Sequence, residues 1–192
     1  MRLIRMRFLL LVCSVVLLLA ACSGPAPKSG SDEWKAMVST SDKKLEKAKV
    51  KRVVDGDTFA VDVNGKEKKV RMILMDTPES KAPNRPQGYL GEEAKQYTTK
   101  RLTGQTVWLE RDVKANDQYG RWLRYVYLDV AGGKGEFFNG TLVRSGYARL
   151  ATFPPNVKYV DDIRKWQTEA REAGRGVWQN IKDAFPDRKV EQ

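Results

Sequence analysis

Alternating apolar and polar residues in the first half of the chain predict three successive β-strands. The first run begins near Ala48 and ends at Asp55-Gly56, a turn signal. Thr58–Val63 follows as a second run, and Asn64-Gly65 is a two-residue hairpin signal. A third run extends from Lys69 to Met75. The pattern predicts a three-stranded meander.

The second half of the chain predicts two more strands and three helices. Acidic residues open the segment Glu92–Leu102 and basic residues close it, as the helix dipole favours. Turn signals stand at Asp117–Gly120 and Ala131–Gly135. The remaining expected elements are strands at Thr106–Arg111 and Arg121–Val130, and helices at Phe138–Ser145 and Val160–Ala173.

The order of these elements predicts the fold class. Five short strands with one helix between the third and the fourth match the plan of an OB-fold. We therefore expect an α+β, mainly β protein: a five-stranded OB-fold barrel with three helices. Because one fold can serve many functions, this expectation alone assigns none.

The N-terminus has the pattern of a targeting segment. Arginines precede an apolar run from Phe8 to Ala21, which is short for a membrane span. It ends in Leu19-Ala20-Ala21-Cys22, which resembles the lipobox of bacterial lipoproteins. That resemblance implies cleavage before Cys22 and a lipid on its sulfur. An ordinary signal peptide with an incidental cysteine is the alternative.

These features divide the chain into four expected regions. Residues 1–21 are a lipoprotein signal peptide, and residues 22–47 are the lipidated cysteine with a tether rich in Ser, Gly, Pro, Ala and Lys. Trp34 and Met37 interrupt the tether, so part of it is expected to pack on the domain. The domain covers 48–182, and 183–192 is a polar tail.

Charge and residue usage narrow the chemistry. The chain has 35 Lys and Arg against 24 Asp and Glu. Without the three arginines of the signal segment the net charge is +8, from 32 basic and 24 acidic residues. A basic surface suits a polyanionic partner, although many soluble proteins are basic without one. The absence of histidine excludes histidine-ligated zinc and a histidine general base.

Three polar clusters hold the candidate chemistry. Asp55-Gly56-Asp57-Thr58 and Asp117–Arg121 follow turn patterns, and Asp76-Thr77-Pro78-Glu79 follows a strand that contains Arg71. Each cluster alone is explained by a turn, and Arg71 with Asp76 and Glu79 could form a self-satisfied ion-pair network. An arginine in a buried strand costs desolvation energy unless it meets an anion.

Taken together, the clusters resemble the thermonuclease (staphylococcal nuclease) family over about residues 48–178. The resemblance implies a calcium ion held by the carboxylates of Asp57 and Asp76 and the carbonyl of Thr77. It also implies that Glu79 is the general base and that two arginines and a tyrosine contact phosphates: Arg71, Arg121 and Tyr119. Gln118 departs from the lysine of the best-known member. Phe153 could stack on a base, where the family uses tyrosines.

Elementary chemistry supports the same assignment. Phosphodiester cleavage needs positive charge directed at the phosphate oxygens, and a guanidinium supplies it without losing its proton. An all-oxygen set of ligands suits calcium. Lys68, Lys69, Lys81 and Arg85 could guide a polyanion, or they are ordinary solvated surface.

The resemblance therefore implies a calcium-dependent, sequence-tolerant endonuclease of DNA and RNA. It is expected to act outside the cytoplasm as a monomeric lipoprotein anchored through Cys22, and to favour single-stranded or frayed substrate. The alternatives are a non-catalytic nucleic-acid-binding OB-fold lipoprotein and a binder of surface polymers.

Overall fold

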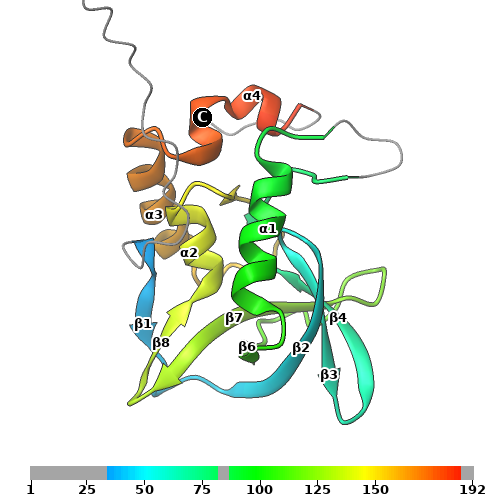
Figure 1. Ribbon diagram of the computed structural model, residues 1–192. Coiled ribbons are helices and arrows are strands. Elements are labelled where there is room, and N and C mark those ends of the chain that lie inside the picture. Colours follow the sequence, from blue (N-terminus) through cyan, green and yellow to red (C-terminus); the bar gives the residue numbers. More distant parts are fainter. Residues whose placement is uncertain (1–33, 82–86, 187–192) are drawn as a thin grey trace, which may run out of the picture.

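The structure, a computed structural model, describes residues 34–81 and 87–186 (Figure 1). Helices pack against the flank of a β-barrel and lie above it in this view. In the described ranges the strands are β1 (Met37–Ser39), β2 (Leu45–Asp55), β3 (Thr58–Val63), β4 (Lys66–Met72), β5 (Met75–Asp76), β6 (Thr106–Glu110), β7 (Trp122–Ala131), β8 (Lys134–Phe137) and β9 (Arg149–Leu150). The helices there are α1 (Gly91–Leu102), α2 (Phe138–Arg144), α3 (Val160–Glu172) and α4 (Ile181–Ala184), with a 3₁₀ turn at Gly176–Gln179.

Strands β2, β3, β4, β7 and β6 close into a barrel. The sheet order is β1-β8-β7-β4-β3-β2-β6, and the additional pairing of β6 with β7 closes the ring. β4 and β7 run parallel, with Arg71 opposite Leu123. The predicted five-stranded OB-like barrel is confirmed. In the described part of the chain, the short helix α4 adds a fourth α-helix to the three that were predicted.

The meander that opens the barrel follows the sequence closely. β2, β3 and β4 pair antiparallel in succession. Asn64 and Gly65 connect β3 to β4 with φ values of 52° and 77°. Two successive positive φ angles match the type I′ turn that suits the twist of a hairpin. Asp62 accepts a hydrogen bond from the Gly65 N–H at 3.0 Å, which steadies the turn.

The third predicted strand is divided in two, which corrects the expectation of one strand from Lys69 to Met75. β4 ends at Met72, and Leu74 adopts a φ of 60°. The backbone of Ile73 forms its hydrogen bonds outside β4. Its N–H donates to the Arg124 carbonyl, and its own carbonyl accepts from the Asn139 side-chain amide at 2.9 Å. The chain then turns into β5, which pairs with β9 rather than with the barrel.

A strand replaces part of one predicted turn. The turn expected over Ala131–Gly135 is confined to Gly132-Gly133, whose φ values are 56° and 73°. β8 begins directly after it and pairs with β7. Two glycines permit so tight a reversal because they adopt positive φ without a steric penalty.

The domain extends beyond the expected boundary at Ala48. β1 lies within the segment that was assigned to the tether, and it pairs with β8. β2 begins at Leu45, opposite Glu110 of β6. The Trp34 ring lies 3.5 Å from the Arg175 guanidinium. Residues 34–47 therefore belong to the domain, because free edges of β8 and β6 are available to pair with them.

The C-terminal boundary also moves. Ala184 and Phe185 were expected in a polar tail, but they are buried and form a small second core with Val177. Tyr89, Leu90 and Trp178 pack against this cluster. The last helix thereby attaches to the loop that precedes α1.

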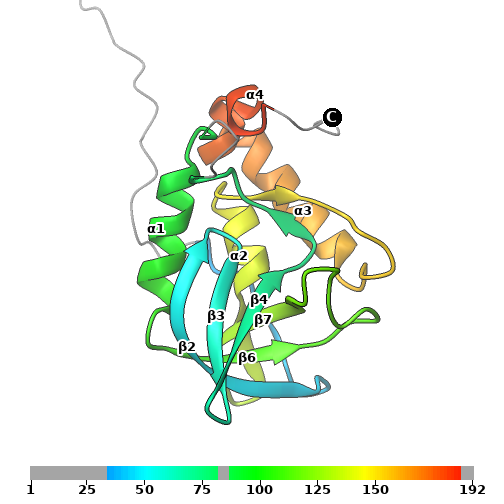
Figure 2. The ribbon, with the colours of Figure 1, turned by 90° about the vertical axis from the view of Figure 1, so that its right-hand side faces the viewer.

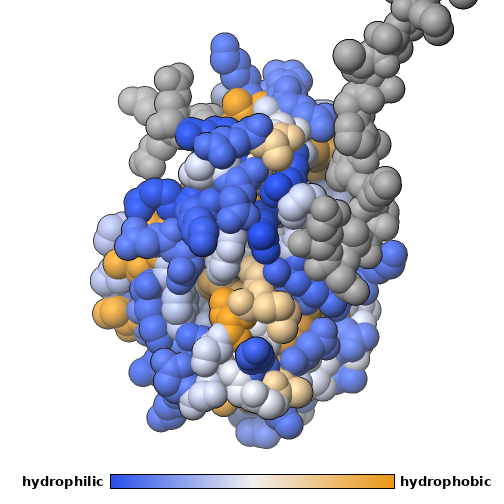
Figure 3. All heavy atoms as spheres, turned by 90° about the vertical axis from the view of Figure 1, so that its left-hand side faces the viewer, coloured by the Kyte–Doolittle hydropathy of each residue, from blue (hydrophilic) through white to orange (hydrophobic). Residues whose placement is uncertain are grey.

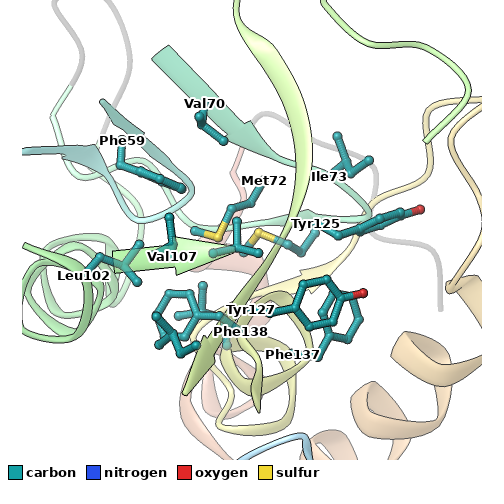
Figure 4. Packing of buried hydrophobic residues seen from close by; sticks show 14 of the residues in the cluster. Phe59, Val70, Met72, Ile73, Leu102, Val107, Tyr125, Tyr127, Phe137 and Phe138 are labelled. Carbon is teal, nitrogen blue, oxygen red and sulfur yellow. The ribbon is translucent and has the colours of Figure 1, made fainter. Parts of the chain in front are cut away.

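The main core fills the barrel and the space between barrel and helices (Figure 4). Phe59, Met72 and Val107 point inward from the strands, and Tyr127 stacks on Phe137 at a ring-centroid distance of 5.2 Å. Ile163 and Ala170 of α3 are buried as its apolar stripe predicts. Figure 3 shows the face of the molecule opposite to that in Figure 2. This face is mainly hydrophilic, with a limited apolar area.

The predicted signal peptide and Cys22 lie outside the described residues. In residues 34–81 and 87–186, no helix has the length and apolar character needed to cross a membrane.

Candidate functional site

A pocket of about 700 Å³ opens on the outer side of the barrel, where β3, β4 and β5 meet two loops. Figure 2 shows this side, with the short strands β5 (teal) and β9 (yellow) above the barrel strands. One loop contains Asp117–Arg121 and the other follows β9. The pocket brings together all seven residues predicted to bind metal or substrate or to act in catalysis: Asp57, Arg71, Asp76, Thr77, Glu79, Tyr119 and Arg121.

Arg71 lies between the two candidate metal-binding carboxylates. Its guanidinium forms ion pairs with Asp57 Oδ2 and, at 3.1 Å, with Asp76 Oδ1. Burial alone would lower the pKa of Arg71, but the two carboxylates more than offset this effect and raise the pKa above its ordinary value. Arg71 therefore stays charged, and two carboxylate oxygens face it, one from the turn between β2 and β3 and one from β5.

The Asp57 carboxylate is held by its neighbours as well. The Thr58 hydroxyl donates to Asp57 Oδ1 at 2.8 Å. The N–H and the hydroxyl of Thr77 lie 3.4 and 3.2 Å from Asp57 Oδ2. Gly56 permits this approach, since a Cβ there would lie 2.7 Å from Thr77 Oγ1. Thr58 was not predicted to take part, although its place directly after Asp57 was a usable signal.

Glu79 has an acidic neighbour that the sequence did not assign. Burial raises the pKa of Asp55; hydrogen bonds from Ser80 and the Gly56 N–H lower it, and the Glu79 carboxyl raises it again. The net pKa of Asp55 is above its ordinary value. Glu79 thus belongs to a second pair of acids beside Asp57 and Asp76. The Asp-Gly-Asp pattern contained this signal, but a turn explained it equally well.

The backbone of Glu79 is tightly enclosed. The Gly88 N–H donates to the Glu79 carbonyl at 3.0 Å. A Cβ added at Gly91 would lie 2.2 Å from that same carbonyl oxygen. Glycine is therefore required at the start of α1, because a side chain would push Glu79 out of place. Leu90, with a φ of 63°, turns the chain into the helix.

Asp117 organises the third cluster. Its carboxylate accepts from Arg121 Nε at 2.6 Å and from the N–H groups of Tyr119 and Arg121 at 2.9 Å each. Partial burial alone would raise the pKa of Asp117, but the hydrogen bonds from Arg121 and Tyr119 lower it. The sequence predicted only a turn for this segment. It did not indicate that Asp117 orients the Arg121 side chain.

Two exposed aromatic side chains line the pocket. Tyr119 is 75% exposed and Phe153 is 72% exposed, so both present a ring to solvent. Asn156 ties the two loops together: it accepts from the Lys114 N–H at 2.8 Å and donates to the Lys114 carbonyl at 2.9 Å. Gln118 also lines the pocket, whereas Lys81 is exposed outside it and Arg85 lies outside the described residues.

The donor set suits a hard cation. Within the described residues, no three His, Cys, Asp or Glu side chains converge as a metal cluster. The predicted set joins two carboxylates to the carbonyl of Thr77, and this structure sets Thr77 against Asp57. The Arg71 guanidinium shows that the two carboxylates accommodate positive charge between them. Oxygen ligands of this kind fit calcium.

Comparison with known proteins agrees with this site. The sequence profile "Staphylococcal nuclease homologue" matches residues 69–180. The chain is 45% identical to a thermonuclease of Staphylococcus hyicus over 132 residues, covering 69% of this chain and 75% of the relative. It is 42% identical to a thermonuclease of Staphylococcus intermedius over 141 residues, 73% of this chain and 81% of the relative. Endonuclease YncB of Bacillus subtilis (strain 168) is 38% identical to the chain over 142 residues, which cover 73% of this chain and 65% of the relative. With this extent of identity on a matching barrel and pocket, the chain belongs to the staphylococcal nuclease family.

Proposed function

We propose that this protein is a calcium-dependent, sequence-tolerant endonuclease that hydrolyses phosphodiester bonds of DNA and RNA outside the cytoplasm. Family membership makes it a nuclease. The observation that carries the finer proposal is the convergence of two carboxylates, two arginines and Glu79 in one pocket. Nuclease chemistry needs a metal ligand set, a base and fixed positive charge, and the pocket contains residues for each.

Asp57, Asp76 and the carbonyl of Thr77 would hold the calcium ion. When bound, calcium neutralises phosphate charge and orients the substrate. Arg71 would then exchange its carboxylate partners for the phosphate. Its planar fork binds two phosphate oxygens at once, and a guanidinium does not lose its proton under these conditions.

Glu79 would act as the general base. A carboxylate near the carboxylates of the metal site can accept the proton of the attacking water. The chain has no histidine that could take this role. Arg121, aimed by Asp117, would stabilise the charge that builds on the phosphate in the transition state. Tyr119 stands beside Arg121, with the guanidinium 5.5 Å from its ring, where it can contact a neighbouring phosphate.

Sequence tolerance follows from what the pocket offers. Its charged groups contact phosphates, which are identical at every nucleotide. The exposed ring of Phe153 can stack on any base, because every base has a flat face. A base can leave its stack most easily in single-stranded or frayed nucleic acid, so we expect those substrates to be preferred.

Chelation of calcium tests the proposal. Purified protein should nick and then degrade plasmid DNA and RNA when calcium is present, and cleavage should fall to background in excess chelator. Readdition of calcium should restore it, while magnesium, with its stricter octahedral geometry, should restore much less.

A binding assay run in parallel separates the alternatives. Retained DNA binding with no cleavage at any calcium concentration would instead identify a non-catalytic nucleic-acid-binding protein. Binding to wall polymers by protein that is inert on nucleic acid would identify a surface-polymer binder.

The lipoprotein assignment is a separate part of the proposal, since it depends on Cys22 alone. The full-length protein, expressed in a bacterial host with labelled palmitate, should incorporate label and sediment with membranes. Cys22→Ala should remove both properties. Cys13→Ala changes the other cysteine of the chain, within the expected signal peptide, and serves as the control that keeps both. Label on the Cys22→Ala variant would refute anchoring at this residue.

A further inference from the structure

Each candidate metal-binding carboxylate is held on two sides. One oxygen of Asp57 and one of Asp76 face Arg71. The Thr58 hydroxyl holds the remaining oxygen of Asp57 at 2.8 Å. The remaining oxygen of Asp76, Oδ2, faces Nη2 of Arg149 at 3.5 Å. The four contacts hold both carboxylates against the Arg71 guanidinium.

Arg149 is itself fixed by its surroundings. It lies directly opposite Asp76 in the antiparallel pair of β9 with β5. Its side chain is only 11% exposed. Its guanidinium lies 4.2 Å from the ring centroid of Phe185, which is a cation–π contact. Since Phe185 is buried in the second core, Arg149 has little freedom to move away from Asp76.

The segment that contains Phe185 also supports the loop after Glu79. The Tyr89 N–H donates to the Asp183 carbonyl at 2.9 Å. A Cβ at Gly88 would lie 2.4 Å from the Ala184 carbonyl oxygen. The C-terminal segment from Asp183 to Phe185 therefore contacts both Arg149 and the loop that encloses the Glu79 backbone.

We propose that Arg149, clamped by the ring of Phe185, is a positioning residue that orients the Asp76 carboxylate toward Asp57 for calcium binding. This inference rests on the proposed calcium-dependent function. Groups that orient a metal ligand from behind change metal affinity or activity by about 10–100-fold when removed.

The sign of the effect distinguishes positioning from simple charge. A positive charge near a cation repels it, so loss of Arg149 would tighten calcium binding if charge were its whole contribution. If Arg149 sets the orientation of Asp76, its loss lets the carboxylate rotate away and weakens calcium binding. The two accounts predict opposite changes.

Calorimetric titration with calcium, in the absence of nucleic acid, tests the inference. Arg149→Met should weaken calcium binding about 10–100-fold. Phe185→Leu keeps the Arg149 charge and removes the aromatic face, and it should weaken binding in the same direction by a smaller factor. Arg144→Met is the control, because Arg144 is another partly buried arginine, 29% exposed, that pairs with Glu169 at 2.9 Å outside the pocket.

Thermal unfolding without calcium accompanies each titration. All three variants are expected to melt somewhat lower than the parent, but only Arg149→Met and Phe185→Leu should bind calcium more weakly. If Arg149→Met does not fold, Phe185→Leu decides. Unchanged or tighter calcium binding in the folded variants overturns the inference alone. A parent protein that binds no calcium overturns the proposed function and the inference with it.

Discussion

Replacing Glu79 with glutamine is expected to lower kcat by about 10²–10⁴-fold, the usual contribution of a general base. Glutamine preserves the size and the hydrogen-bonding reach of the side chain but cannot accept a proton from water. The backbone at this position is fixed by Gly88 and Gly91, so the variant should keep the local geometry. The measurement is single-turnover cleavage of an end-labelled oligonucleotide at saturating calcium.

The Glu79 result needs a control for the loss of one negative charge. Glu172 is a suitable control position, because it is exposed at the end of α3 and lies outside the pocket. Glu172→Gln should cleave at the parent rate. Calcium affinity of the Glu79→Gln variant should be measured beside its rate, so that a weaker metal site is not mistaken for a lost base. Near-normal kcat in the Glu79 variant would remove Glu79 from the role of base.

Replacing Arg121 with alanine is expected to lower kcat by about 10²–10³-fold, the typical loss when one donor to a developing oxyanion is removed. The guanidinium is held by Asp117 in the free protein, so it is already aimed when substrate arrives. Arg121→Lys should recover only part of the activity, because an ammonium keeps the charge but loses the fork. Steady-state kcat and KM on the same oligonucleotide are the quantities to compare.

Arg164 offers a close control for the Arg121 variants. It forms an exposed local ion pair with Asp161 at 2.7 Å, much as Arg121 pairs with Asp117 at 2.6 Å, but it lies on α3 outside the pocket. Arg164→Ala should leave both kinetic constants within error of the parent. A higher KM with unchanged kcat in Arg121→Ala would instead assign Arg121 to uniform substrate binding rather than to the transition state.

The barrel could be predicted because its determinants are local. Asn64-Gly65 predicts the turn between β3 and β4, and the charge distribution of Glu92–Leu102 predicts helix α1. The break at Ile73 and Leu74 could not be predicted from local patterns. It depends on the Ile73 N–H donating to the Arg124 carbonyl and on the Asn139 amide donating to the Ile73 carbonyl, and both partners are remote in sequence. β1 was not predicted for a similar reason. Its three residues form a strand because they pair with the edge of β8, which is remote in sequence.

The candidate site divides in the same way. Residues that belong to recognisable clusters, such as Asp57 and Asp76, were identified from the sequence. Arg149 was not, because nothing beside it in the chain indicates an acidic partner that lies 73 positions away. Nor did the sequence show that Asp55 lies against Glu79, since a turn explained Asp55 equally well.

The amino-acid sequence by itself therefore determined the family, the barrel and the kinds of side chain available for chemistry, because these depend on local patterns and on motifs close together in the chain. Only the tertiary structure decided which oxygen of each carboxylate faces Arg71, what holds the other oxygen, and how the C-terminal Phe185 reaches the site. Those properties depend on contacts between distant segments, and such contacts exist only once the barrel has closed and the helices have packed on it.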